Sequence, residues 1–157
     1  MNENIYLDTS VLGATCDPGP DERLQATTRF RDGLRHGKWN GYISGLVLEE
    51  IARASEAIQT RIQSHLADVP LLLLEESDIS IALAQAYLDA GAIPHNYRND
   101  ARHVAMATTN HITVIVSWNF RHMVNLHRKR ELNSVNMKQG YPLIDLVSPM
   151  EMNYEEQ

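Results

Sequence analysis

The sequence predicts an α/β fold of three layers, in which a central, mostly parallel sheet of about five strands lies between helices. Two observations support this expectation. Short apolar or β-branched segments alternate along the chain with segments whose apolar residues recur at helical spacing, as in parallel sheets with helical crossovers. The 157 residues, 43% of them hydrophobic, show no repeat or linker, so we expect a single domain over residues 1–157.

Each expected strand is a short run of residues that favour extended backbone. The β-branched run 112–116 predicts a central strand, and the four leucines 71–74 predict a buried one. Polar or turn-forming residues flank these runs. The expected strands are Ile5–Leu7, Gly41–Ser44, Leu71–Leu74, Ile112–Val116 and Leu143–Val147.

Helices are expected between these strands. The helix opened by Asp78 would bury Ile81, Ala84 and Leu88, and Asn99 would cap the helix that follows Pro94. Five helical segments are expected. The first is capped by Asp21 and stops near Gly37, and the third carries Ile58, Ile62 and Leu66. The other three are Leu46–Ala54, Asp78 to Gly91, and Asp100–Thr109.

Composition and charge exclude several classes of protein. A lone cysteine, Cys16, excludes a disulfide scaffold, and the seven histidines lack zinc-ligand spacing. No apolar run approaches the roughly 20 residues that span a bilayer, and no export signal opens the chain, so we expect a cytoplasmic protein. The net charge of −6 argues against a nucleic-acid coat protein, although residues 118–138 carry five basic side chains against one acidic.

Acidic and polar residues follow the expected strands at the sheet edge where ligands of open parallel sheets bind. Asp8 follows the first strand, Glu49 and Glu50 lie after the second, and Asp100 lies in the first turn of a helix. Ser10 accompanies Asp8, and Ser117 and Asn119 follow the run 112–116. Hard oxygen ligands select Mg²⁺ or Mn²⁺, and such an ion supports phosphodiester hydrolysis.

Four segments resemble the motifs of the PIN-domain family, ribonucleases that include the VapC-like toxins of toxin–antitoxin pairs. The segments are Ile5–Leu12, Ile43–Ile51, Asn99–Thr108 and Val116–His122, in the order of the family and across nearly the whole chain. The resemblance implies a Mg²⁺- or Mn²⁺-dependent ribonuclease in which Asp8, Glu50 and Asp100 ligate the metal. It also implies an RNA substrate and a toxin, with an antitoxin as partner and a homodimer as its assembly.

The fourth motif departs from the family, which has Thr-x-Asp where this chain has Ser117 and Asn119. An amide can hold a metal-bound water but supplies no negative charge. The chain is therefore similar to a PIN-like subgroup with Ser-Trp-Asn. Ser10 and Ser117 are candidates for orienting a carboxylate or a water, and Arg121 for contacting a phosphate.

Each candidate also has a purely structural interpretation. Asp8 could cap a turn, Asp100 could stabilise a helix dipole, and Asn119 could serve turn chemistry. Glu50, not Glu49, would point inward if Val47 and Ile51 face the sheet. His103, one helical turn after Asp100, could touch substrate, but it is expected to be packed or solvated.

The basic residues, the aromatic residues and the function also have alternative interpretations. The basic run from Arg121 to Arg130 could be a solvated helix face, and Trp118 and Phe120 could fill the core instead of stacking on a base. The alternative to an endonuclease is a PIN-like module that binds RNA or a protein without cutting. A phosphoacceptor domain fits less well, because no acidic pair ends the first strand.

Overall fold

The computed structural model describes residues 2–16 and 21–153. Its strands form one parallel sheet in the order β3-β2-β1-β4-β5. The three-layer α/β architecture predicted from the sequence is confirmed. The strands of the described residues are β1 (Asn4–Leu7), β2 (Asn40–Ser44), β3 (Leu71–Leu74), β4 (Val114–Val116) and β5 (Asp145–Val147).

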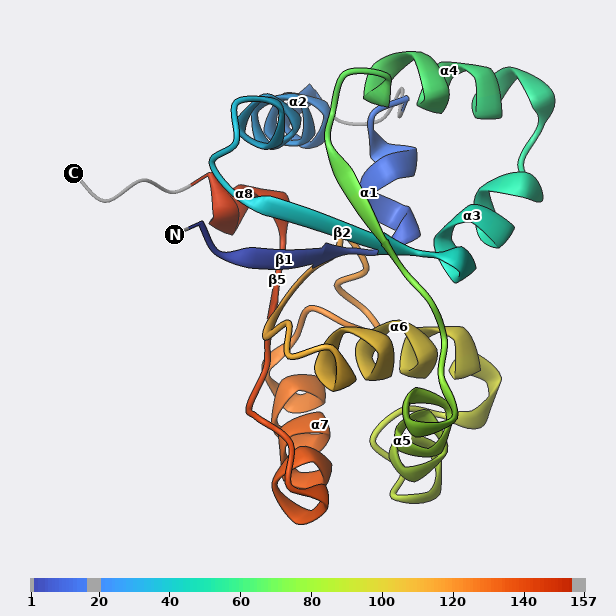
Figure 1. Cartoon of the computed structure of the whole chain (residues 1–157), viewed down its shortest axis with the longest axis vertical. Helices are drawn as coiled ribbons and strands as arrows, with labels where there is room; N and C mark the ends of the chain where they lie inside the picture. The colour runs from blue at the N-terminus through green and yellow to red at the C-terminus, as the bar shows by residue number, and fades with distance from the viewer. Residues whose placement is uncertain (1, 17–20, 154–157) are drawn as a thin grey trace.

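Helices cover both faces of this sheet (Figure 1). One face is covered by α1 (Thr9–Ala14), α2 (Asp21–Arg35), α3 (Gly45–Ala52), α4 (Glu56–Leu66) and the short α8 (Pro149–Met152). The other is covered by α5 (Asp78–Asp89), α6 (Arg98–Thr109), which follows the 3₁₀ turn η1 (His95–Tyr97), and α7 (Leu126–Gln139). Neither α1 nor α8 was expected from the sequence. Asp21, which was expected to cap the second helix from outside, is the first residue of α2.

The core lies on both sides of β1 and β4. Tyr6 from β1, Ile115 from β4, Phe30 from α2 and Tyr87 from α5 are among its largest fully buried side chains. Apart from the exposed Asn4 at the start of β1, both central strands consist of buried, largely apolar residues, as is usual for a parallel sheet covered by helices on each face. This covering fixes β1 beside β4, the two strands whose ends carry the candidate site.

Strand β3 exists as predicted, but the expectation that it is buried was wrong. Leu72 and Leu73 are 56% and 53% exposed. The reason is that β3 lies at the sheet edge and pairs only with β2, so neighbouring elements cover its ends and leave its middle open. A run of four leucines does not distinguish an edge strand from a central one.

Two expectations about helices were also wrong. Ile81 is 52% exposed. The other two predicted residues of α5, Ala84 and Leu88, are buried, and the buried face also includes Leu83 and Tyr87. Asn99 lies inside α6, since the 3₁₀ turn at His95–Tyr97 moves the start of the helix to Arg98. Asn99 is consequently available for a side-chain role within the candidate site.

Candidate functional site

The candidate site lies at the carboxyl ends of β1, β2 and β4. Leu7 pairs with Val116, so the residues that follow them, Asp8 and Ser117, emerge side by side. The strand order reverses between β1 and β4, because β2 and β3 extend the sheet on one side and β4 and β5 on the other. Such a reversal leaves the crevice at which ligands bind in open α/β sheets.

Asp8 is buried and held by two hydroxyl groups. Ser10 Oγ donates to Asp8 Oδ1 and Ser117 Oγ donates to Oδ2, each at 2.5 Å. Burial raises the pKa of Asp8 above its usual value, against the opposing effects of the His103 charge and these two hydroxyl bonds. The Asp8 side chain makes no capping hydrogen bond to α1, so the turn-capping interpretation does not describe it.

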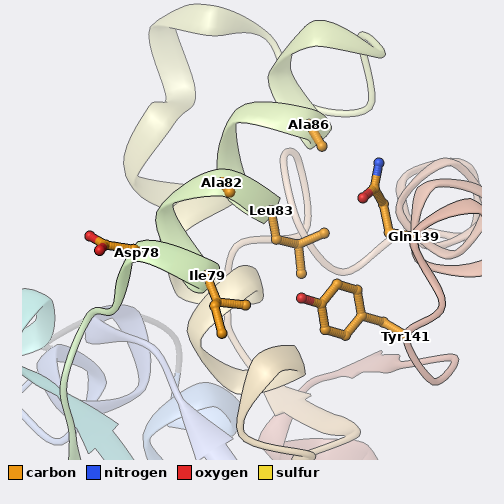
Figure 2. Close-up of a pocket in the computed structure, with 7 residues that line it drawn as sticks. All are labelled: Asp78, Ile79, Ala82, Leu83, Ala86, Gln139 and Tyr141. Atoms are coloured by element: carbon orange, nitrogen blue, oxygen red, sulfur yellow. The ribbon is translucent and has the colours of Figure 1, made fainter.

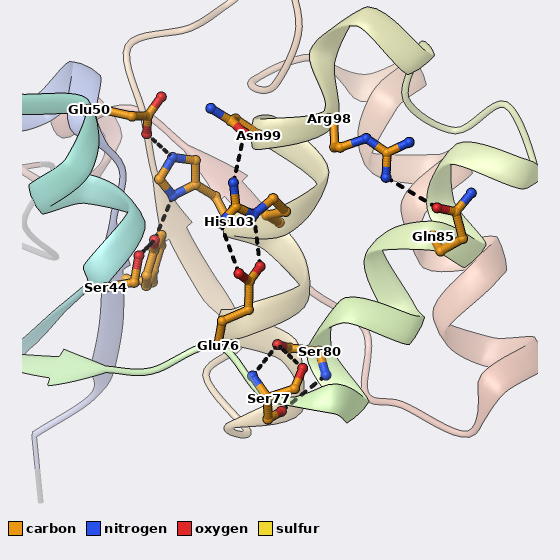
Figure 3. A network of polar contacts seen from close by, with 11 residues as sticks. Ser44, Glu50, Glu76, Ser77, Ser80, Gln85, Arg98, Asn99 and His103 are labelled. Carbon is orange, nitrogen blue, oxygen red and sulfur yellow. Dashed lines mark hydrogen bonds and ion pairs between the residues drawn. The ribbon is translucent and has the colours of Figure 1, made fainter. Parts of the chain in front are cut away.

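Glu50, on α3, points into the site, whereas its neighbour Glu49 is exposed. Its Oε1 accepts from Thr9 Oγ1 at 2.8 Å and from His103 Nε2 at 2.6 Å, a contact visible in Figure 3. Burial would raise the pKa of Glu50, but the hydrogen bond and charge of His103, with bonds from Thr9 and Asn99, lower it overall. An ionised Glu50 is therefore favoured in the folded protein.

Asp100 lies in the first turn of α6 and has a different environment. Burial raises its pKa to about 6, an effect that the charges of Asp8 and Glu50 reinforce and those of His103 and Arg128 oppose. Within the described part of the chain, no side chain donates a hydrogen bond to its carboxylate. The carboxylates of Asp8 and Glu50 thus act electrostatically on Asp100, which receives no side-chain hydrogen bond from the described residues.

The residues after β4 are arranged as a compact turn. Ser117 Oγ accepts from the Asn119 backbone N–H at 2.9 Å, and Ser10 Oγ accepts from that of Trp118 at 2.9 Å. Asn119 Oδ1 accepts from the His122 backbone N–H at 3.0 Å, which is the turn chemistry considered for this residue. The structure thus connects Ser10, Ser117 and Asn119 to Asp8, with the Asn119 side-chain oxygen used locally.

Basic and aromatic side chains follow Ser117 along the chain. Arg121 is exposed, and Arg128, at the start of α7, is close enough to act on the pKa of Asp100. Trp118 is buried and donates from Nε1 to Thr27, as expected of an aromatic residue that fills the core. Phe120 instead is 52% exposed and packs edge-on against the Trp118 ring, with centroids 5.8 Å apart.

Sequence reasoning did not find the polar residues that support this site from α6. His103, expected to be packed or solvated, is 3% exposed and bonds to both Tyr6 and Glu50. Arg102 forms a two-pronged ion pair with Glu76 at 2.8 Å per bond and donates to Asn99 Oδ1 at 3.0 Å (Figure 3). The spacing of Asn99 and His103, one helical turn apart beside Asp100, is the signal that could have indicated them.

The donor set fits a hard divalent cation in its chemistry, since all three acids supply oxygen and Asp100 lacks a partner. The positions of these acids do not form a complete metal site. Among residues 2–16 and 21–153, no group of three or more His, Cys, Asp or Glu side chains is placed to hold an ion together. Mg²⁺ commonly takes only one or two carboxylates and keeps several waters, so a pair of these acids would suffice for a first contact.

A separate cavity of about 360 Å³ lies between α5 and the end of α7 (Figure 2). Ile79, Leu83 and Tyr141 line it together with Gln139, and none of the candidate site residues contributes. This cavity is therefore distinct from the carboxylate cluster. In the described residues, moreover, each helix is too short or too polar to traverse a lipid bilayer.

Comparison with known proteins supports the fold. No protein-family model matches the sequence, and no curated protein resembles it significantly. The structure is similar, with a TM-score of 0.57 and 16% sequence identity, to a chain in the crystal structure of VapBC2 from Rickettsia felis. In that crystal VapBC2 is bound to a DNA fragment from its promoter. The match covers 92% of this chain and 98% of the other, and at this identity it shows that the chain has the PIN-like fold.

Proposed function

We propose that this protein is a ribonuclease that hydrolyses RNA phosphodiesters with Mg²⁺ or Mn²⁺ held by Asp8, Glu50 and Asp100. The observation that carries the proposal is that three carboxylates from separate segments lie close enough to interact: the pKa of Asp100 is raised to about 6, mainly by burial and further by the charges of Asp8 and Glu50. Like charges gathered at a functional crevice are relieved by a cation between them. When bound, such an ion lowers the pKa of a water and stabilises charge on a phosphoryl oxygen.

The surrounding side chains would prepare this chemistry. Ser10 and Ser117 each donate to one oxygen of Asp8 and so fix the plane of its carboxylate. Asn119 would orient a water or a phosphate through its amide nitrogen, because its oxygen accepts from the backbone of His122. An amide in this place adds no charge, so the site would carry three acids and not four.

The rim of the site supports RNA as the substrate. Arg121 is exposed and would contact a phosphate beside the scissile one, while Arg128 is close enough to lower the pKa of Asp100. Phe120 presents an exposed ring next to Asn119, on which an unpaired base can stack. A local basic border on a protein with net charge −6 would direct a polyanion to this edge of the sheet.

A second candidate function is an RNA- or protein-binding module that does not cut. Two observations favour it: no three-ligand arrangement exists among the described residues, and Asn119 uses its side-chain oxygen in a turn. Titration of the protein with Mn²⁺ in a calorimeter separates the two candidates. Absence of binding at millimolar Mn²⁺ would favour the non-cutting module.

The biological role that we propose is that of a toxin in a toxin–antitoxin pair. The support is the PIN-like fold shared with a chain of VapBC2, together with the four motifs. An antitoxin would bind over the acidic crevice, and a homodimer is the expected assembly. A small reading frame for an antitoxin beside this gene is the simplest observation that would support this role.

The ribonuclease proposal is tested by incubating RNA with the protein and Mn²⁺ or Mg²⁺. We expect cleavage by the wild type and its loss in Asp8→Asn, which keeps the shape of the side chain but removes its charge. Glu49→Gln is the matched control, because Glu49 is exposed beside Glu50 and should be dispensable. Equal cleavage by wild type and Asp8→Asn would refute the assignment.

A further inference from the structure

A continuous line of hydrogen bonds runs beneath the candidate site. Ser44 Oγ lies 2.8 Å from Tyr6 Oη, Tyr6 Oη lies 2.6 Å from His103 Nδ1, and His103 Nε2 lies 2.6 Å from Glu50 Oε1. Tyr6 and Ser44 are 0% exposed and His103 is 3% exposed. Figure 3 shows the imidazole between Glu50 on one side and Ser44 on the other. Three elements, β1, β2 and α6, thus meet in one polar line that ends at a candidate metal ligand.

Donor and acceptor capacities set the direction of these bonds. An ionised Glu50 can only accept, so His103 Nε2 must carry the hydrogen. The Tyr6 hydroxyl keeps its proton, because burial raises its pKa well above the usual value. With a neutral imidazole, Tyr6 donates to His103 Nδ1 and its oxygen accepts from Ser44, so every member of the line has a hydrogen-bond partner.

The consequence for Glu50 is a fixed carboxylate. Both His103 and Thr9 donate to the same oxygen, Oε1, from opposite elements, α6 and α1. Two donors on one oxygen prevent the carboxylate from rotating and favour its ionised form. A glutamate has three rotatable bonds, so without these donors its charged end would sample positions away from Asp8 and Asp100.

We propose that His103 is a positioning residue: Tyr6 and Ser44 hold it as the tautomer with hydrogen on Nε2, and in this form it fixes Glu50 for a divalent cation. The inference deepens the proposed function and rests on it for the identity of the ligand. Groups that orient a metal ligand typically change metal affinity by about 10- to 100-fold when they are removed. The expected losses for Tyr6 and His103 variants lie in this range.

The chain offers a matched control for the removal of a buried hydroxyl. Tyr87 is also 0% exposed, and its Oη donates to Asn136 Oδ1 at 2.5 Å, away from the carboxylates. Tyr6→Phe and Tyr87→Phe therefore each remove one buried hydroxyl from a core tyrosine. Both should lower the melting temperature, and this shared effect measures the structural part of the role of Tyr6.

The experiment combines nitrogen NMR of the imidazoles with Mn²⁺ titration of the full chain. The His103 resonances are assigned by their disappearance in His103→Gln. We expect an unprotonated Nδ1 and a protonated Nε2 in the wild type and in Tyr87→Phe, and an altered signature in Tyr6→Phe. Mn²⁺ affinity should fall about tenfold in Tyr6→Phe and remain near wild type in Tyr87→Phe. His103→Gln, which retains a donor toward Glu50, should lose less affinity than His103→Ala.

Several results would overturn the inference. A His103 with hydrogen on Nδ1 would contradict the proposed direction of the bonds. Equal losses of Mn²⁺ affinity in Tyr6→Phe and Tyr87→Phe would show that only stability is affected, and a wild type that binds no Mn²⁺ would remove the positioning role. This experiment does not measure RNA cleavage. A protein that binds Mn²⁺ as expected but cuts no RNA would therefore refute the proposed ribonuclease function and leave the positioning role of His103 standing.

Discussion

Replacing Asp100 by asparagine should make the metal-free protein more stable at neutral pH. The carboxylate of Asp100 is crowded by Asp8 and Glu50 and receives no hydrogen bond from the described residues. Its pKa is about 6 in the folded protein, against an ordinary value of 3.8. Asparagine has the same shape and no charge, so Asp100→Asn removes the unfavourable ionisation and leaves the packing of α6 nearly unchanged.

The size and pH dependence of the effect follow from this shift. Between pH 3.8 and about 6 the folded state binds more protons than the unfolded state, so stability falls as the pH rises through this window. A shift of about 2 pH units corresponds to about 3 kcal/mol, an upper value because solvent screens a partly exposed group. We expect Asp100→Asn to gain about 1–3 kcal/mol at pH 7.5 and almost nothing near pH 4.

Urea unfolding with a metal chelator present, repeated from pH 4 to pH 8, measures this difference. Glu49→Gln is the control, because Glu49 is exposed on α3 and its replacement should change stability by less than about 0.5 kcal/mol. Adding Mn²⁺ should stabilise the wild type more than Asp100→Asn, since only a ligand that binds the folded state raises stability.

The reasoning would be refuted if Asp100→Asn were less stable than the wild type at pH 7.5 and this deficit became smaller on acidification. That result would mean that Asp100 acts as an acid at a helix N-terminus, where its charge stabilises α6. The two interpretations of Asp100 predict opposite signs at neutral pH, so one measurement decides between them.

Other predictions follow from the rim of the site and from the sheet edge. Asn119→Asp keeps an oxygen for the His122 backbone N–H and adds a charge, so calorimetry should show tighter Mn²⁺ binding; unchanged affinity would place Asn119 outside the site. Arg121→Ala should weaken RNA binding and reduce the slope of log affinity against log salt by about one, measured by fluorescence anisotropy; an unchanged slope would exclude a phosphate contact. Leu73→Lys on the exposed edge strand should reduce aggregation in light scattering without lowering the melting temperature; a large destabilisation would contradict its exposure.

The sequence was sufficient for the architecture where apolar patterns are strong. β1, β2 and β4 appear where β-branched and apolar residues predicted them, and their order along the chain led to a parallel sheet. It was insufficient where exposure depends on neighbours far away in the chain. The four leucines of β3 do not reveal an edge position. In α5, Ala84 and Leu88 are buried as expected but Ile81 is exposed, because packing against α6 determines which residues are covered.

The candidate site was predictable in its acids but not in their support. Asp8, Glu50 and Asp100 were named from their places after strands or in helices together with the resemblance to the PIN-domain motifs, and their role as metal ligands stays a prediction. The hydrogen bonds of His103 were not predictable, because its partners Tyr6 and Glu50 are 97 and 53 residues away in sequence. The local environment of a lone histidine on a helix resembles that of a packed core residue, and only the folded topology reveals the hydrogen bonds.

The distance along the chain between Asp8 and Ser117 has a consequence for synthesis. The two side chains bond across 109 residues, and β1 lacks one of its two neighbours until β4 has left the ribosome. A nascent chain that ends before residue 114 contains all three acids but has neither β4 nor the turn that orders Asp8. For the ribonuclease proposed above, cleavage would therefore begin only after about three quarters of the polypeptide has been made, and prematurely terminated products would not cut the RNA that encodes them.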